Sequence, residues 1–96
     1  MKPGPRNIVF RVHAIQRMFQ RRISEEDVRY VLDAGEVIEE YPGDVPYPSK
    51  LILGERDQRY FHVVVAENKA SRETIVVTVY EPNLGSWEPG FRRRKK

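Results

Sequence analysis

The hydrophobic period of this chain changes at Gly35, and this change limits the fold more than any other feature of the sequence. Before Gly35, apolar residues recur at the three- and four-residue spacing of amphipathic helices. After Gly35, apolar and polar residues alternate, as they do in half-buried strands. Helices grouped ahead of strands are typical of an α+β domain.

Two helices are expected before the change of period. The first follows a short β-branched strand over residues 8–12 and covers residues 13–22, with a basic, wetter stripe beside its apolar one. The second begins after Ser24, an N-cap residue with Asp27 placed to close a capping box. Gly35 is expected to end this helix as a C′ residue.

Four further strands are expected after the helices, at residues 36–41, 50–54, 59–66 and 73–80. Short polar turns join the last three, which predicts hairpins and a mainly antiparallel sheet. The element order is then β-α-α-β-β-β-β, and both helices should cover one face of a twisted sheet.

Alternation along the two longest strands assigns their faces. The wholly apolar sets, expected under the helices, are Phe61, Val63 and Val65, and Ile75, Val77 and Val79. The less covered face receives His62, Thr78 and Tyr80.

The length of 96 residues predicts one domain with a core over about residues 8–91 and loose or basic ends at 1–7 and 92–96. Cysteine is absent and there are only two histidines, with no H-x-x-x-H pair, so we expect no metal site and no cofactor. No apolar stretch approaches the roughly 20 residues of a membrane span. Cytoplasmic residence is the default expectation, with no membrane partner.

Charge is segregated along the chain despite a net value of only +3. Residues 1–22 hold six basic residues and no acid, residues 23–45 carry a net −7, and residues 92–96 add five more positive charges. If the two basic segments meet in space, they form one cationic surface that would gather phosphates. A terminal basic run is equally typical of a solvated tail.

Candidate catalytic residues are sought among histidine, arginine and tyrosine. A metal-independent ribonuclease needs a base for the 2′-hydroxyl, cations for the phosphate and an acid for the leaving oxygen. His62 and Tyr80 lie on adjacent strands and can fill such roles, although for His62 a structural role ranks ahead of catalysis. His13 and Arg17, one helical turn apart, either bind phosphate or fix the local structure.

Other residues suit nucleic-acid binding, because aromatics beside arginines hold single strands without reading sequence. The candidates are Arg21, Arg22, Trp87, Arg92, Arg93 and Arg94. The tyrosines at positions 41, 47, 60 and 80 are candidates for stacking on bases, but packing is the commoner role of tyrosine on a sheet.

Several blocks together resemble a known family. They are His13-Ala14-Ile15-Gln16-Arg17-Met18, Arg21-Arg22-Ile23-Ser24, Leu51-Ile52-Leu53-Gly54, His62-Val63-Val64-Val65, and Val79-Tyr80 followed by Pro82 and Trp87. They are similar to an uncharacterised prokaryotic domain family that opens with an H-A-x-x-R-M motif and is grouped with the RelE/ParE-like toxins. The resemblance covers about residues 8–93.

This resemblance implies a compact RelE/ParE-like sheet with two N-terminal helices, RNA as the partner, including ribosome-bound mRNA, and neutralisation by a cognate antitoxin. It carries over the motif residues His13, Arg17, His62, Tyr80 and Trp87, with Arg92 and Arg93 aligned less firmly. The leading hypothesis is a toxin-like metal-independent endoribonuclease. The alternative is a non-catalytic module, either RNA-binding or a ParE-like inhibitor of a protein such as gyrase, or an inactive member of the family, because fold alone does not set the target.

Overall fold

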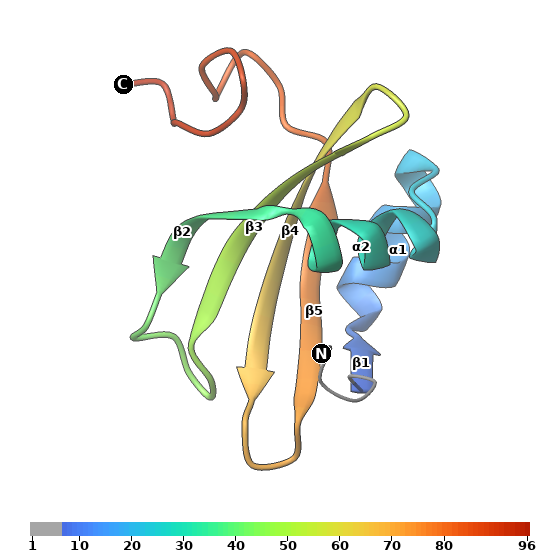
Figure 1. The fold of residues 1–96 in the computed structure, drawn as a ribbon, viewed down its shortest axis with the longest axis vertical. Helices are drawn as coiled ribbons and strands as arrows, with labels where there is room; N and C mark the ends of the chain where they lie inside the picture. Colours follow the sequence, from blue (N-terminus) through green and yellow to red (C-terminus); the bar gives the residue numbers. More distant parts are fainter. Residues whose placement is uncertain (1–6) are drawn as a thin grey trace.

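A five-stranded mixed sheet forms the centre of the computed structural model, which describes residues 7–96 (Figure 1). The strands are β1 (Asn7–Phe10), β2 (Glu36–Tyr41), β3 (Ser49–Arg56), β4 (Arg59–Asn68) and β5 (Glu73–Tyr80). The helices are α1 (Val12–Arg21) and α2 (Glu25–Ala34). The predicted order β-α-α-β-β-β-β is therefore confirmed.

The sheet has the strand order β1-β5-β4-β3-β2, so β1 and β2 are its edges. β2, β3, β4 and β5 pair antiparallel in chain order, as predicted, and β1 runs parallel to β5. The long connection between β1 and β5, with two helices and three strands, permits this parallel pairing, which a short hairpin would not. Of the predicted loose lead, residues 1–6 lie outside the described residues, and Asn7 already belongs to β1.

Both helices pack on one face of the sheet, α1 against β5 and α2 mainly against β3 (Figure 1). The core between them contains Val28 and Val31 of α2 and Phe61, Val63 and Val65 of β4. The predicted helix-facing set of β4 is thus confirmed.

The predicted helix-facing set of β5 is confirmed for Val79, which pairs with Val63 and lies in the helix-side core, and is wrong for Ile75. A register shift between Val64 and Val65 makes Val64 pair with Thr78 but Val65 with Val76. Val76 therefore enters the helix-side core, whereas Ile75 pairs with Ala66 on the opposite face. A bulge inserts one extra residue into one strand, so it reverses the alternation that the sequence pattern suggests.

The N-terminus of α2 has the predicted capping box. The Ser24 hydroxyl accepts a hydrogen bond from the Asp27 amide, and the Asp27 carboxylate accepts one from the Ser24 amide, both at 3.0 Å. Gly35 ends the helix in an extended conformation with φ −77°, not as a left-handed C′ residue. Glycine is required there because the backbones of α2 and β3 approach it closely. A Cβ would lie 2.5 Å from the Val31 carbonyl oxygen and 2.7 Å from that of Leu53.

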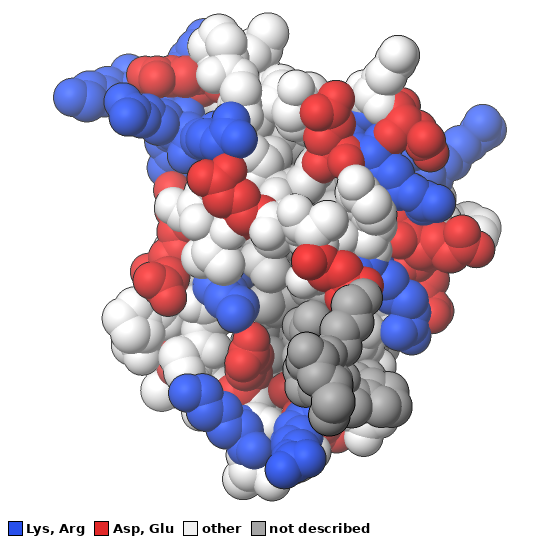
Figure 2. Space-filling model, viewed as in Figure 1, with Lys and Arg blue, Asp and Glu red and all other residues white. Residues whose placement is uncertain are grey.

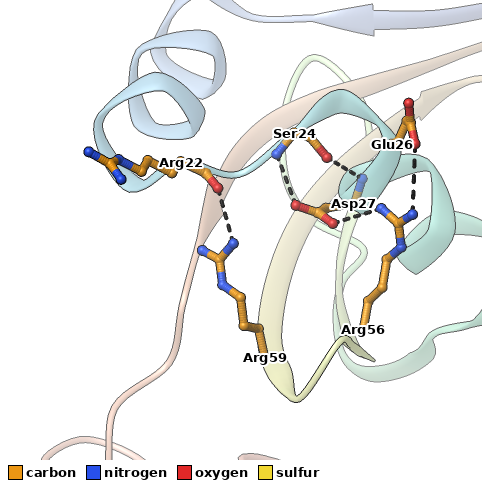
Figure 3. Close-up of polar contacts among 6 residues, drawn as sticks. All are labelled: Arg22, Ser24, Glu26, Asp27, Arg56 and Arg59. Carbon is orange, nitrogen blue, oxygen red and sulfur yellow. Dashed lines mark hydrogen bonds and ion pairs between the residues drawn. The ribbon is translucent and has the colours of Figure 1, made fainter.

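The β3–β4 hairpin holds the short joint between the helices (Figure 3). Arg56 binds the Asp27 carboxylate at 2.8 Å, beside the first turn of α2. Arg59 donates to the Arg22 carbonyl at 3.0 Å, where α1 ends, and pairs with Glu81. Each cation thus satisfies groups that a helix end leaves unpaired or charged.

Candidate functional site

His62 lies on the sheet face opposite the helices, as predicted, but it is fully buried. Its Nε2 is 2.8 Å from the Phe91 carbonyl oxygen, which can only accept, so Nε2 carries the proton. Nδ1 then accepts from the Tyr80 hydroxyl at 3.1 Å. Burial lowers the pKa of His62, and the charge of Arg94 lowers it further against the opposing effect of the Phe91 bond. The imidazole is therefore a neutral member of a second core.

The C-terminal segment, residues 82–96, covers this second face of the sheet. The Trp87 ring is buried, with its centroid 4.4 Å from that of His62. The Arg94 guanidinium lies 4.6 Å from the centre of the Trp87 ring, and Phe91 packs 4.9 Å from Tyr60. Trp87 and Phe91 thus hold the segment against this face of the sheet.

Two arginines attach the segment to β2. Arg94 binds both oxygens of the Glu39 carboxylate, at 2.9 and 3.0 Å, and Arg92 binds Glu36 at 2.8 Å. The Tyr41 hydroxyl also donates to Glu39. The hydrogen bond from Arg94 lowers the pKa of Glu39, so this carboxylate stays charged under the segment. Arg92 and Arg94, predicted to bind nucleic acid, are here engaged within the molecule, and Arg93 is exposed without an ion pair in residues 7–96.

Glu39 is not among the site residues predicted from the sequence, and neither is the adjacent carboxylate Glu40. Their opposite orientation on β2 was the available signal. Glu39 is half-buried under the segment, whereas Glu40 is exposed. Alternation therefore separates an anchoring carboxylate from a solvated one.

The predicted catalytic residues do not form one centre. His13 and Arg17 are exposed on α1. This helix packs against β5 on the face of the sheet where Val63 is buried. His62 and Tyr80 lie on the opposite face, under the C-terminal segment. The structure thus brings His62 and Tyr80 together and keeps both apart from His13 and Arg17, because α1 covers the opposite face of the sheet.

The two basic segments do not meet either. α1 lies over β5, towards one edge of the sheet, while Arg92 and Arg94 are attached to β2 at the other edge. Figure 1 shows the C-terminus and α1 on opposite sides of the molecule. In Figure 2, Lys and Arg side chains interleave with Asp and Glu on the viewed face. The hypothesis of one joint cationic surface is therefore wrong for the described part of the chain.

α1 presents a separate group of cations. Residues 11–22 contain no acid, and His13, Arg17 and Arg21 follow one another at four-residue spacing along the exposed side. None of these three makes an ion pair within the part of the chain that the structure describes. Arg22, next in line, has a left-handed backbone at the helix end and an exposed side chain. We call Arg17, Arg21, Arg22 and His13 the basic stripe.

The tyrosines predicted to stack on bases are all half-buried. Tyr47 accepts a hydrogen bond from Asn68 at 2.9 Å, and Tyr60 packs on Phe91. Tyr41 and Tyr80 bond to Glu39 and His62 as described above. Each ring is thus engaged in packing or in a hydrogen bond within the domain.

The described residues show no group of three or more metal-ligating side chains. Among residues 7–96, no helix is long and apolar enough to cross a membrane.

Together these features define a small α+β domain whose sheet carries two helices on one face and a C-terminal cover on the other. A family model for a domain of unknown function, DUF4258, matches residues 10–81, and the chain belongs to this family. No curated protein and no solved structure matches the chain. The matched range contains both helices and strands β2–β5 but stops before the C-terminal segment.

Proposed function

We propose that this protein is RNA-directed and that the basic stripe on α1 is its phosphate-binding surface. One observation carries the proposal. The arginines at positions 29, 56, 59, 92 and 94 are all paired with carboxylates, whereas those of the basic stripe are not. A cation without an internal partner retains its full charge for an external anion.

The geometry of α1 suits a polyanion. Side chains four residues apart lie one above the other, with a rise of about 6 Å along the axis, so they can contact successive phosphates. Arg22 follows directly after the last helical residue and adds a further exposed cation at this end of α1. Because no acid lies between residues 11 and 22, no local carboxylate competes for these cations.

RNA, as the particular polyanion, comes from the resemblance of the H-A-x-x-R-M block to RelE/ParE-like toxins. In this block His13 and Arg17 are the motif residues, and both belong to the basic stripe. The same resemblance supports a cytoplasmic, toxin–antitoxin setting for the activity.

Binding of labelled single-stranded RNA, measured by fluorescence anisotropy over a range of salt concentrations, tests the proposal. The double variant Arg17→Gln/Arg21→Gln should bind more weakly than wild type at every salt concentration. Loss of two phosphate contacts should reduce the slope of log affinity against log salt by about 1.4, at roughly 0.7 per contact on a single strand.

Lys69→Gln/Arg72→Gln is the matched control. Both residues are exposed near the β4–β5 turn and make no ion pair in the described chain, so this variant loses the same charge elsewhere. It should keep the wild-type slope. Equal losses in the two double variants would show that only net charge matters and would refute a defined surface on α1.

Metal-independent RNA cleavage is a second candidate, supported by the contact between His62 and Tyr80 beside the Arg94 guanidinium. A histidine, a phenol and a cation are the groups that such a reaction needs. Since His62 has no exposed surface, substrate can reach it only after residues 87–94 leave the sheet.

Incubation of total RNA with the protein in a chelator, alone and with translating ribosomes, tests cleavage. Activity in wild type that is lost in folded His62→Ala and Tyr80→Phe variants would establish the nuclease. Intact RNA in both settings would refute cleavage and leave RNA binding alone as the proposed function.

A further inference from the structure

α1 carries an apolar stripe that the domain does not bury. Val12, Ile15 and Phe19 are 70, 51 and 88% exposed and follow one another at three- and four-residue spacing, on one side of the helix. An amphipathic helix that serves only its own core turns such residues inward, as α1 does with Ala14 and Met18. The apolar stripe is therefore surplus to the fold.

The apolar stripe is separate from the cations of α1. In a helix with about 3.6 residues per turn, Arg17 lies on nearly the opposite side from Ile15 and Phe19. The exposed amide side chains of Gln16 and Gln20 lie between the two sides. A charged partner would therefore find no ion pair along the apolar stripe, whereas a second uncharged apolar surface would fit it.

A depression in the surface lies beside the most exposed end of the apolar stripe. This cavity of about 570 Å³ is bounded by Met18, Phe19, Arg22, Ile23 and Ser24, where α1 passes into α2. Phe19 is thus both the most exposed member of the apolar stripe and a wall of the cavity. A projection beside a hollow suits a two-fold interface, because the projection of each copy can then enter the hollow of the other.

The charges around the cavity suit the same symmetry. One wall is Arg22, which is exposed, and another is Ser24, where the acidic first turn of α2 begins. In that turn the Glu26 side chain is 84% exposed. A two-fold axis that runs between these walls brings the basic wall of one copy to the acidic wall of the other. The Arg22 guanidinium would then also lie over the entering Phe19 ring, a favourable cation–π arrangement.

We propose that the apolar stripe and the cavity form the interface of a symmetric homodimer, in which Phe19 of each copy enters the cavity of the other. Val12 and Ile15 would extend the apolar contact along α1. Arg17 and Arg21, on the far side of the helix, would stay exposed in both copies, so the dimer would present two phosphate-binding surfaces at once. Dimer formation does not depend on RNA binding, and its test contains no RNA.

Sedimentation velocity over a range of protein concentrations tests the interface. Wild type should pass from monomer to dimer with a Kd on the order of 10 µM, because a few apolar side chains make an interface at the small end for specific complexes. Ile15→Ser/Phe19→Ser should dimerise at least roughly tenfold more weakly, as expected when central apolar anchors are removed. Circular dichroism and thermal unfolding establish that each variant is folded.

Val45→Ser/Leu84→Ser is the matched control. Val45 is 89% exposed, as Phe19 is 88% exposed. Leu84 is 53% exposed, close to the 51% of Ile15, and both control residues lie outside α1. The control thus loses equally exposed apolar side chains elsewhere, and it should dimerise as wild type does.

Crosslinking gives a second test, because the chain contains no cysteine. A single introduced cysteine can therefore be joined only to its counterpart in another copy. Gln16→Cys places a thiol at the border of the apolar stripe, and Arg17→Cys places one on the far side of α1. A short bismaleimide should join Gln16→Cys into a covalent dimer and leave Arg17→Cys unjoined.

Three results would overturn the proposal. Wild type that stays monomeric at every concentration would remove the interface. A dimer that Ile15→Ser/Phe19→Ser leaves intact would assign the association to another surface, such as the edge strand β1 or β2. Equal crosslinking of Gln16→Cys and Arg17→Cys would show that the copies meet by collision, with no preferred side of α1.

Discussion

His62 shows how one polar residue can organise a core. Both ring nitrogens have partners, Tyr80 on β5 and the Phe91 carbonyl in the C-terminal segment, and the ring packs edge-on against Trp87. No buried side-chain nitrogen or oxygen among the described residues lacks a hydrogen bond. Such a fully satisfied group joins the sheet to the segment that covers it, whereas an apolar substitute would leave two buried partners unpaired.

The buried state of His62 predicts a pH dependence of stability. Its folded pKa lies below the ordinary value of 6.5, so below that pH the unfolded chain takes up a proton that the folded chain does not. The free energy of unfolding should therefore fall as the pH drops from about 7.5 to about 5.5, by at most about 1.4 kcal/mol per pH unit from this residue. Urea unfolding at a series of pH values measures this decrease in the free energy of unfolding.

His62→Gln removes the titrating group, and the difference between its pH profile and that of wild type isolates the contribution. His13→Gln, which changes the exposed histidine on α1, should retain the decrease. A His62→Gln profile as steep as the wild-type one would contradict the argument.

At the scale of elements, two devices set how the helices sit on the sheet. The capping box and Arg56 fix where α2 begins. Burial raises the pKa of the Asp27 carboxyl, but the hydrogen bonds from Ser24 and Arg56 lower it by more. The pKa of Asp27 therefore lies below the usual carboxyl value. The close approach of α2 to β3 sets how near this helix lies to the sheet. Gly54 meets Val31 so tightly that a Cβ would lie 2.6 Å from its Cγ2.

Gly35→Ala should destabilise the domain by about 1–3 kcal/mol, the usual cost of forcing extra volume into a packed site. The added Cβ would meet the carbonyl oxygens of Val31 and Leu53, and backbone cannot rotate away as a side chain can. The φ of −77° is open to alanine, so strain at Gly35 itself contributes nothing. Thermal and urea unfolding provide the measurement.

Gly43→Ala is the control, because nothing lies within 4 Å of a Cβ at Gly43. Its stability should stay within about 0.5 kcal/mol of wild type, as for other surface substitutions. A similar loss in both variants would mean that glycine flexibility, not contact with β3, explains the effect.

At the scale of the molecule, the sheet is covered on both faces by different parts of the chain. The helices cover one face through apolar contacts, and the C-terminal segment covers the other through Trp87, His62 and ion pairs to β2. The segment lies beyond the range that the family model matches. The basic stripe on α1 and the buried His62 lie on opposite sides of the sheet.

Glu39→Gln should loosen the C-terminal segment by roughly 1 kcal/mol, since Arg94 would lose its ionic partner at a site that solvent partly screens. Trp87 is the only tryptophan and is the residue of the segment that packs on His62 of the sheet, so its fluorescence reports docking directly. Quenching of Trp87 by acrylamide should increase in the variant, while the far-ultraviolet circular dichroism stays unchanged.

Glu40→Gln is the neighbouring control, an exposed carboxylate on the other side of β2 with the same change of charge. Its quenching should match wild type. Greater exposure of Trp87 in Glu40→Gln than in Glu39→Gln would refute the anchoring role of the Arg94 pair.

Local patterns in the sequence determined the elements of this protein. Ser24 with Asp27 marks the start of α2, Gly35 marks its end, and alternation separates Val63 from His62, because capping and side-chain period depend only on residues close together in the chain. Membership of the DUF4258 family agrees with the resemblance found in the motif blocks at the level of an uncharacterised family.

Only the tertiary structure decided which distant groups meet. The bulge in the β4–β5 pairing reversed the faces of Ile75 and Val76, and the return of residues 82–96 buried His62 and paired Arg94 with Glu39. Likewise, α1 and the C-terminal arginines were placed at opposite edges of the sheet. Such contacts depend on strand order and on competition among many partners for the same charges, and local spacing contains no information about either.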